Sequence, residues 1–248
     1  MAVPLHYGSA RLPPMVQVND RYFPELDKGI VKPPSPEDLW DWYEKYYGDN
    51  DPDPSWGKIW DSAKHLGQRI CDVEGKHIVE LGCGLGPIGV CAAKKNKVIL
   101  VDREPFALHC ACATASLNGL TIGTADDDKA QVAAIVATFD DLKDPQWRRD
   151  KNFPGKVDLI VASDVLYDNH VAMDNLAATC EALLDGEGSA LIADPLQGRA
   201  FGARTSFLRA AKHKGAHVHE EILLRDALEP TVLITLTWGP LGSSSSKR

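Results

Sequence analysis

A short apolar stretch that runs into alternating glycines constrains the fold more than any other part of the chain. Residues 77–81 read His-Ile-Val-Glu-Leu, the pattern of a buried strand. Gly82, Gly84 and Gly86 follow, and a helical segment is expected after them. Glycine allows tight turns and lets a ligand approach the backbone more closely than a Cβ would permit. The stretch therefore predicts a strand–loop–helix unit whose loop binds a nucleotide-type ligand.

The acid inside this strand separates two kinds of nucleotide site. Residues 84–89 satisfy the dinucleotide pattern Gly-x-Gly-x-x-Gly, which alone is a weak signal. Glu80 lies two residues before Gly82, where it would repel a pyrophosphate and attract a sulfonium or amino group. Counted from Gly82, the loop follows Gly-x-Gly-x-Gly after Glu-Leu, which resembles motif I of class I S-adenosylmethionine (SAM) methyltransferases. The resemblance implies SAM as the cofactor, bound by Glu80, Gly82, Gly84 and Gly86.

A second apolar run, residues 98–102, ends in a single acid. Asp102 lies twenty positions after Gly82, the separation at which doubly wound folds bring a carboxylate to the hydroxyls of a ribose. The alternative is that Asp102 caps the helix that begins near residue 105. We favour the ribose contact and include the adjacent Arg103 in the expected cofactor site.

The strand over residues 157–163 is followed by Asp164-Val165-Leu166-Tyr167, at the edge where open α/β sheets bind ligands. Here the chain resembles methyltransferase family 16, the protein lysine methyltransferase-like branch, whose hallmark is Asp or Glu, two residues, then Tyr or Phe. The resemblance implies that Asp164 orients the acceptor amine, that Tyr167 shapes its channel and that Ser163 contacts the cofactor. The ordinary alternatives are a helix cap for Asp164 and core packing for Tyr167.

Two further segments complete the expected site. Residues 56–66 resemble the family's Trp-x-(Ser/Ala)-Ala-x-x-Leu segment, which implies that Trp60 walls the cofactor pocket. Packing of its large apolar ring is the alternative. After the third strand of the sheet, Phe139 is expected to lie along the adenine ring and Asp140 to accept a hydrogen bond from the adenine amino group. The aromatic-rich ending common in the family is absent there.

Strands and helices alternate from residue 77 onward, which predicts an α/β fold. We expect a Rossmann-like, doubly wound, mostly parallel seven-stranded sheet that closes with an antiparallel C-terminal hairpin. One such domain, residues 56–240, leaves no room for the second mononucleotide-binding half of a dehydrogenase. Strands are expected at 77–81, 98–102, 132–139, 157–163, 189–194, 216–224 and 231–237, and helices at 88–94, 105–118, 173–184 and 204–212.

The two ends of the chain differ from this domain in composition. Residues 1–35 are rich in proline and polar residues, so we expect them to lie outside the core. Residues 1–55 are expected to form an extension that acts as a lid or docks the substrate. Residues 241–248 are polar and predict a disordered tail. No targeting segment is visible, and no apolar run approaches the roughly 20 residues of a membrane span.

Charge and cysteine content limit the expected partners. The formal net charge of −8 argues against nucleic acid, whose phosphates need clustered Lys and Arg. The six cysteines do not form a loop-rich disulfide framework or a ligand cluster, which indicates reduced thiols, a cytoplasmic protein and no metal. We expect a monomer that is not attached to a membrane.

Three functions from different classes remain open. A protein lysine methyltransferase leads, with a protein substrate that presents an accessible lysine as its partner. The second is a small-molecule N- or O-methyltransferase. The third is a SAM-binding interaction module without turnover.

Overall fold

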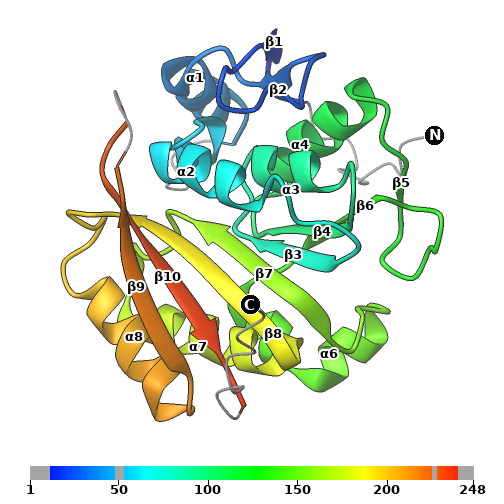
Figure 1. Ribbon diagram of the computed structural model, residues 1–248. Coiled ribbons are helices and arrows are strands. Elements are labelled where there is room, and N and C mark those ends of the chain that lie inside the picture. Colours follow the sequence, from blue (N-terminus) through cyan, green and yellow to red (C-terminus); the bar gives the residue numbers. More distant parts are fainter. Residues whose placement is uncertain (1–11, 48–52, 225–227, 240–248) are drawn as a thin grey trace.

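A central β-sheet organises the molecule, for which the computed structural model describes residues 12–47, 53–224 and 228–239. Within these residues, one eight-stranded sheet has the order β5-β6-β4-β3-β7-β8-β10-β9, and β1 and β2 form a separate pair (Figure 1). The strands are β1 (Val16–Val18), β2 (Ile30–Lys32), β3 (His77–Leu81), β4 (Lys97–Asp102), β5 (Ile122–Gly123), β6 (Val132–Val136), β7 (Val157–Ser163), β8 (Leu184–Pro195), β9 (His217–Leu223) and β10 (Thr231–Thr237).

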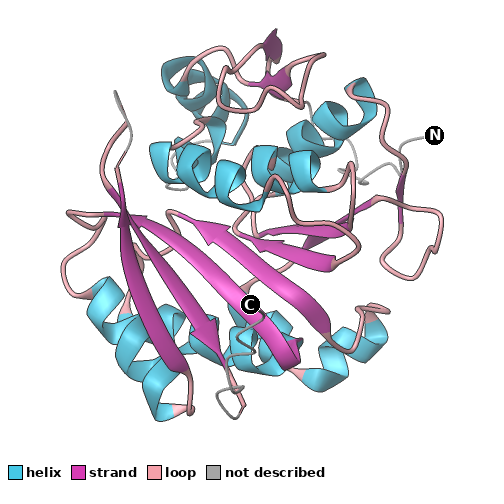
Figure 2. Cartoon of the chain, in the orientation of Figure 1, coloured by secondary structure: helices cyan, strands magenta, loops and turns pink. Residues whose placement is uncertain are grey.

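Helices cover both faces of this sheet. They are α1 (Pro36–Tyr47), the 3-10 helix η1 (Pro54–Gly57), α2 (Asp61–Ile70), α3 (Pro87–Ala92), α4 (Pro105–Leu117), α5 (Phe139–Lys143), α6 (Pro145–Asp150), α7 (His170–Leu183) and α8 (Ala203–His213). Helices α2, α3 and α4 lie on one side of the sheet, and α7 and α8 lie on the other (Figure 2). The result is a three-layer α/β arrangement with a hydrophobic cluster on each face.

The strand pairings confirm the predicted fold class. Strands β5, β6, β4, β3, β7 and β8 run parallel to one another. Strand β10 is antiparallel to both β8 and β9, so the C-terminal hairpin is also confirmed. The described sheet has one strand more than the expected seven, because the two-residue β5 pairs with β6 at the edge. The predicted tail at residues 241–248 lies outside the described residues.

The central strands are almost wholly buried, as parallel strands covered by helices on both faces must be. In β3 only His77 is exposed, and β4 is buried after its first residue. The register pairs Leu81 of β3 with Val101 of β4 and with Ala162 of β7. These three strands therefore end together at one edge of the sheet, which brings together the loops that follow them.

The segment before α1 contributes to the core, so the prediction that residues 1–35 lie outside it was wrong. Phe23, Leu26 and Ile30 are at most 3% exposed and pack in the same hydrophobic cluster as residues of α2, α3 and α4. Gly67 of α2 makes room for Phe23, since a Cβ there would lie 2.5 Å from Cε1 of that ring. The polar and proline-rich composition of the segment concealed three large apolar side chains that its turns direct inward.

Candidate functional site

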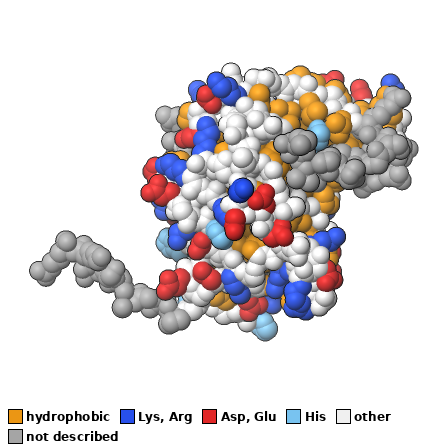
Figure 3. All heavy atoms as spheres, turned by 90° about the vertical axis from the view of Figure 1, so that its right-hand side faces the viewer, with side chains coloured by type: hydrophobic (Ala, Val, Ile, Leu, Met, Phe, Trp, Pro, Cys, Tyr) orange, Lys and Arg blue, Asp and Glu red, His pale blue; other side chains and the backbone are white. Residues whose placement is uncertain are grey.

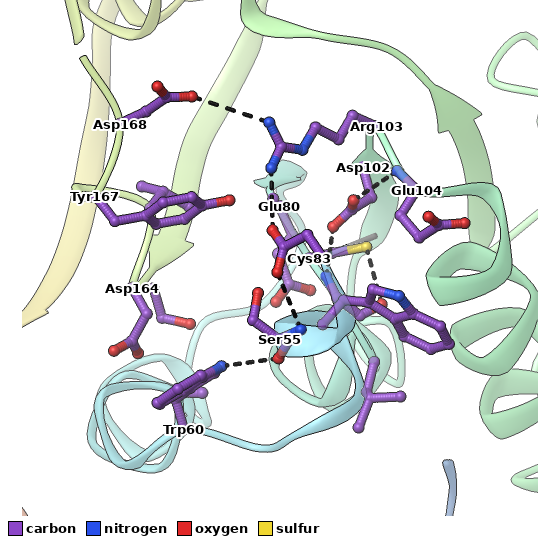
Figure 4. Close-up of a pocket in the computed structure, with 18 of the residues that line it drawn as sticks. Ser55, Trp60, Glu80, Cys83, Asp102, Arg103, Glu104, Asp164, Tyr167 and Asp168 are labelled. Carbon is purple, nitrogen blue, oxygen red and sulfur yellow. Dashed lines mark hydrogen bonds and ion pairs between the residues drawn. The ribbon is translucent and has the colours of Figure 1, made fainter. Parts of the chain in front are cut away.

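A cavity of about 880 Å³ opens at the carboxyl edge of the sheet, where β3, β4 and β7 end. Its volume falls in the range of roughly 300–1,000 Å³ that is usual for small-molecule sites. Of the residues predicted for the site, all except Gly86 line this cavity. Figure 4 shows Glu80, Asp102, Asp164 and Tyr167 around one common space, although they come from three different strands and the loops after them.

The glycine loop forms the floor of the cavity. Its three glycines have left-handed backbone conformations, with φ of 62° at Gly82, 52° at Gly84 and 65° at Gly86. Side chains rarely adopt these angles, so the loop needs glycine on conformational grounds alone. A Cβ at Gly84 would also lie 3.3 Å from the carbonyl oxygen of Trp56, and both residues line the cavity. The loop at Gly84 can therefore pack closely against the backbone of Trp56.

Gly86 lies behind the loop instead of on the cavity wall. A Cβ there would lie 2.8 Å from Cβ of Ala111 in α4 and 3.3 Å from Cδ1 of Leu100 in β4. The structure thus places Gly86 where the start of α3 packs closely on β4 and α4. Its predicted contact with the cofactor has no counterpart in the lining of the cavity.

Glu80 is a buried acid without a cationic partner among the described residues. Its exposed fraction is 2%, and its Oε2 accepts a 2.7 Å hydrogen bond from the backbone N–H of Gly89. Burial, with a smaller contribution from the charge of Asp102, raises the pKa of Glu80 to about 8. A cation bound in the cavity would favour the ionised carboxylate, as expected for the amino group of a ligand.

Asp102, at the end of β4, is tied to the glycine loop. Its Oδ2 accepts a 2.7 Å hydrogen bond from the N–H of Gly84, and its Oδ1 accepts a 2.8 Å bond from the N–H of Glu104. The N-cap of α4 is Glu104, whose side chain accepts from the N–H of Phe106. The alternative role of Asp102 as the cap of that helix is therefore not observed. Each carboxylate oxygen retains a lone pair for a ribose hydroxyl.

Arg103 connects two segments across the mouth of the cavity (Figure 4). Its Nη2 lies 3.0 Å from Oδ2 of Asp53, before η1, and its Nη1 lies 3.9 Å from Oδ2 of Asp168, after β7. Arg103 was predicted as a cofactor contact and does line the cavity. The sequence did not predict that it would bridge two carboxylates, because these lie far from it along the chain.

A hydrogen-bonded chain joins α1 to the wall beside Asp102. The hydroxyl of Tyr43 donates to Oε2 of Glu104 at 2.8 Å, and Nε1 of Trp56 donates to the hydroxyl oxygen of Tyr43 at 3.1 Å. Leu39 and Phe106 complete a hydrophobic cluster around these rings. Part of the predicted 1–55 extension is therefore packed against the cavity wall. Sequence reasoning missed Ser55 and Glu104 as lining residues, since neither belongs to a matching motif.

The segment after β6 is helical where a strand was expected. Strand β6 ends at Val136, and Phe139 begins α5. A capping box causes the change, because the side chains of Thr138 and Asp141 exchange hydrogen bonds with each other's backbone. Phe139 and Asp140 still line the cavity, but Oδ1 of Asp140 accepts a 3.1 Å bond from Nδ2 of Asn175 and faces Lys143 at 2.7 Å.

Asp164 follows β7 in a left-handed conformation, with φ of 57°. It is 7% exposed, and its Oδ1 accepts hydrogen bonds from Nε and Nη2 of Arg199 at 2.9 and 2.6 Å. Its Oδ2 is buried and has no hydrogen-bond partner among the described residues. Burial raises the pKa of Asp164 to about 6, although the guanidinium of Arg199 acts in the opposite direction.

Three side chains surround Asp164 at the cavity mouth. Trp60 is half-buried, and its ring lies 4.1 Å from Cζ of Arg199. Tyr167 is 43% exposed, and Ser163, the last residue of β7, lies partly buried beside Asp164. Arg199 was absent from the predicted site. Its only sequence signal is its place after β8, at the same edge of the sheet.

The described residues contain no helix long and apolar enough to cross a membrane. Among the same residues, no group of three His, Cys, Asp or Glu side chains is arranged to hold a metal ion.

A model of the lysine methyltransferase family matches residues 52–212. The chain belongs to this family. Mouse "EEF1A lysine methyltransferase 3" is 27% identical over 175 residues, which cover 68% of this chain and 66% of that relative. "Protein-lysine N-methyltransferase EFM3" of Chaetomium thermophilum is 30% identical over 141 residues, 52% of this chain and 38% of that relative. The present chain thus matches less than two thirds of the length of each of these two relatives.

Solved structures show the same fold as this lysine methyltransferase family member. Ribosomal protein L11 methylase from Lactobacillus delbrueckii subsp. bulgaricus has a TM-score of 0.50 at 17% identity, covering 72% of this chain and 79% of that one. SMU.776 complexed with SAH has a TM-score of 0.51 at 13% identity, covering 72% of this chain and 50% of that one. At these identities the likeness concerns the fold alone.

SAM, the cofactor of this family, fits the residues at the cavity. Gly82 and Gly84 line the cavity with backbone alone. Glu80 offers a buried acid suited to an amino group, and Asp102 offers carboxylate oxygens suited to ribose hydroxyls. These groups would hold the amino group and the ribose of such a ligand.

Proposed function

We propose that this protein transfers a methyl group from SAM to the ε-amino group of a lysine in a protein substrate. Membership of the lysine methyltransferase family supports the proposal, as do the names of two relatives. The observation that carries it is the position of Asp164, a largely buried acid that lines the cavity together with the predicted cofactor residues and is held by Arg199 through Oδ1. A carboxylate at this place would attract an amine in the cavity and orient its N–H groups.

The cofactor half of the cavity is assigned to named side chains. Glu80 would bind the amino group of SAM, Asp102 its ribose, and the backbone at Gly82 and Gly84 would lie beneath it. The other predicted contacts around this ligand are Trp60, Arg103, Phe139, Asp140 and Ser163.

The acceptor half is assigned to Asp164 and Tyr167. Bound SAM supplies an activated methyl group, whose carbon–sulfur bond breaks as the nitrogen–carbon bond forms, so that positive charge moves from sulfur to nitrogen. The attacking amine must be neutral, and partial desolvation lowers the pKa of a lysine toward that state. Asp164 would orient the amine and face the charge that develops on it. Tyr167, at the mouth, would form one side of the lysine channel.

The first experiment incubates the purified protein with methyl-labelled SAM and a cell extract. Labelled macromolecules are separated on a gel and hydrolysed to identify the methylated residue. We expect a discrete protein band that yields methyl-lysine. Label confined to small molecules would contradict the proposal and favour a small-molecule methyltransferase. No label, despite measurable SAM binding, would favour a binding module.

A matched variant tests the acceptor half. Asp164→Asn keeps an oxygen that can accept from Arg199 but removes the negative charge. We expect the rate of lysine methylation to fall about 10²-fold, the usual loss when one charge-stabilising group is removed. The affinity for SAM, measured by calorimetry, should stay within about twofold. Unchanged turnover with normal SAM binding would refute the role of Asp164.

We further propose that the protein acts as a cytoplasmic monomer and does not bind nucleic acid. The net charge of −8 supports the last point, as does the face in Figure 3, where the coloured Lys, Arg, Asp and Glu side chains are interspersed. We also propose that the N-terminal extension is a fixed surface that docks the substrate, and not a moving lid. The packing of α1 on η1 and α4 supports this role.

A further inference from the structure

Arg199 reaches Asp164 from a separate part of the chain, the loop of residues 196–202 between β8 and α8. Both of its hydrogen bonds, from Nε and Nη2, go to the same carboxylate oxygen, Oδ1. A guanidinium more often bonds both oxygens of a carboxylate at once. Here the one-sided contact leaves Oδ2 without a partner among the described residues. Arg199 therefore compensates the charge of Asp164 without occupying its second oxygen.

Other groups fix the position of this guanidinium. Cζ of Arg199 lies 4.1 Å from the centre of the Trp60 ring, and its Nη2 lies 3.6 Å from Oε2 of Glu229. The loop that carries it is tethered, because the N–H of Leu196 donates to the carbonyl of Pro230 at 2.7 Å. An aromatic face, a carboxylate and a tethered backbone thus hold the arginine beside Asp164.

The neighbouring charges explain why Asp164 depends on Arg199. Asp194 of β8, which is fully buried, carries a charge that disfavours ionisation of Asp164. The guanidinium of Arg204, in α8, already pairs with Asp194 through a 2.7 Å bond from Nε. Glu229 adds another negative charge beside the loop, and Ser62 of α2 offers Asp164 only a hydroxyl. Of the described groups that face Asp164, Arg199 is the cation that pairs with it.

We propose that Arg199 is a positioning residue for methyl transfer, which holds the Asp164 carboxylate through Oδ1 and keeps it in the ionised form that attracts the acceptor amine. This inference rests on the proposed function. It also assigns the loop of residues 196–202 to the acceptor half of the site. A neutral side chain at position 199 would leave Asp164 beside Asp194 without compensation, and Asp164 would then bind a proton at neutral pH.

The first test measures the titration of Asp164 directly in the cofactor-free protein, by carboxyl 13C NMR, with Asp164→Asn to assign the signal. In the wild type we expect a pKa of about 6. In Arg199→Met the pKa should rise by about two units, and Arg199→Lys should restore part of the difference. An unchanged pKa in Arg199→Met would overturn the inference.

The second test follows the pH dependence of turnover. In the wild type the acidic limb of the kcat profile should lie near the pKa of Asp164. In Arg199→Met it should move to higher pH, with kcat reduced about tenfold at pH 7 and largely recovered at pH 9, while KM for SAM stays within about twofold. A uniform loss at all pH values would indicate a merely structural role. A lower KM for the protein substrate with increased kcat would indicate that Arg199 blocks the site. Either result would overturn the inference.

A control uses the same substitution at an exposed arginine of α8. Arg209 lies outside the cavity lining, so Arg209→Met should leave both the titration and the pH profile unchanged. The two proposals fail separately. If the wild type makes no methyl-lysine, the proposed function fails, and the NMR titration alone decides whether Arg199 sets the charge of Asp164.

Discussion

Two buried acids at the cavity differ in how their charge is compensated. Asp164 is paired with Arg199, whereas Glu80 receives only the N–H of Gly89. Their pKa values are raised to about 6 and about 8, respectively. Glu80 is therefore largely protonated at neutral pH until a cation binds beside it. Binding of a ligand with an amino group should then release a proton from Glu80.

Glu80→Gln tests this linkage. In the wild type, SAM affinity should rise between pH 6 and about pH 7.5, because higher pH removes the proton that binding must displace while the amino group of SAM stays protonated. In the variant, affinity should be nearly independent of pH over this range and about tenfold weaker than in the wild type at about pH 7.5. Calorimetry in buffers of different ionisation enthalpy measures both affinity and proton release. Equal pH dependence in the two proteins would exclude Glu80 as the linked group.

The same substitution should change stability with a defined sign. The pKa of folded Glu80 lies above its ordinary value of 4.5, so the free energy of unfolding of the wild type falls as pH rises from about 4.5 to about 8. Relative to the wild type, cofactor-free Glu80→Gln should thus gain stability across this window. We expect a gain of roughly 1–3 kcal/mol at pH 8 by denaturant unfolding.

At the residue scale, sequence reasoning found the acids and missed their partners. Glu80, Asp102 and Asp164 lie at or just beyond the carboxyl ends of strands, and their spacing along the chain is visible in a motif. The pairing of Asp164 with Arg199 spans 35 positions and depends on how a loop between β8 and α8 folds back. No local pattern encodes such a contact.

At the element scale, the glycine loop combines two different requirements. Gly84 faces the cavity, while Gly86 lies where α3 meets β4 and α4. The regular Gly-x-Gly-x-Gly spacing does not show which glycine lines the cavity and which packs on the helices. That difference depends on the side of the folded loop on which each glycine lies. The start of α5 could have been predicted, since Thr138 and Asp141 follow the Thr-x-x-Asp pattern of a capping box.

Gly86→Ala separates packing from binding. The added Cβ would meet Ala111 at 2.8 Å in a backbone conformation that alanine disfavours. We expect a loss of about 1–3 kcal/mol in the free energy of unfolding. The folded fraction of Gly86→Ala should bind SAM with nearly wild-type affinity, whereas Gly84→Ala should bind SAM more weakly. A large loss of affinity in folded Gly86→Ala, with little loss of stability, would return Gly86 to the binding site.

At the scale of the whole molecule, the domain begins earlier than its motifs. The doubly wound order followed from alternating strand and helix patterns, and the hairpin followed from its short connection. The contribution of residues 20–32 to the hydrophobic core could not be predicted in this way, because no periodic apolar pattern marks this segment. Its buried side chains fill a groove that only the assembled α2, α3 and α4 create.

Phe23→Ala measures this contribution. The ring is 2% exposed and packs against Gly67, so its loss should cost about 3–5 kcal/mol in the free energy of unfolding. Phe201→Ala is the matched control, because Phe201 is fully exposed and its loss should change stability by less than about 0.5 kcal/mol. If Phe23→Ala changed the free energy of unfolding in urea as little as Phe201→Ala, the N-terminal segment would not be part of the core.

The sheet order β8-β10-β9 has a consequence for how the chain is made. Strand β10 is synthesised after β9 yet lies between β9 and β8, and its residues Leu233, Ile234 and Leu236 are fully buried. A growing chain that has emerged only as far as β9 therefore presents β8 as an open, apolar edge. Such an edge invites pairing with other chains. The sheet can thus be completed only after the last described strand has left the ribosome.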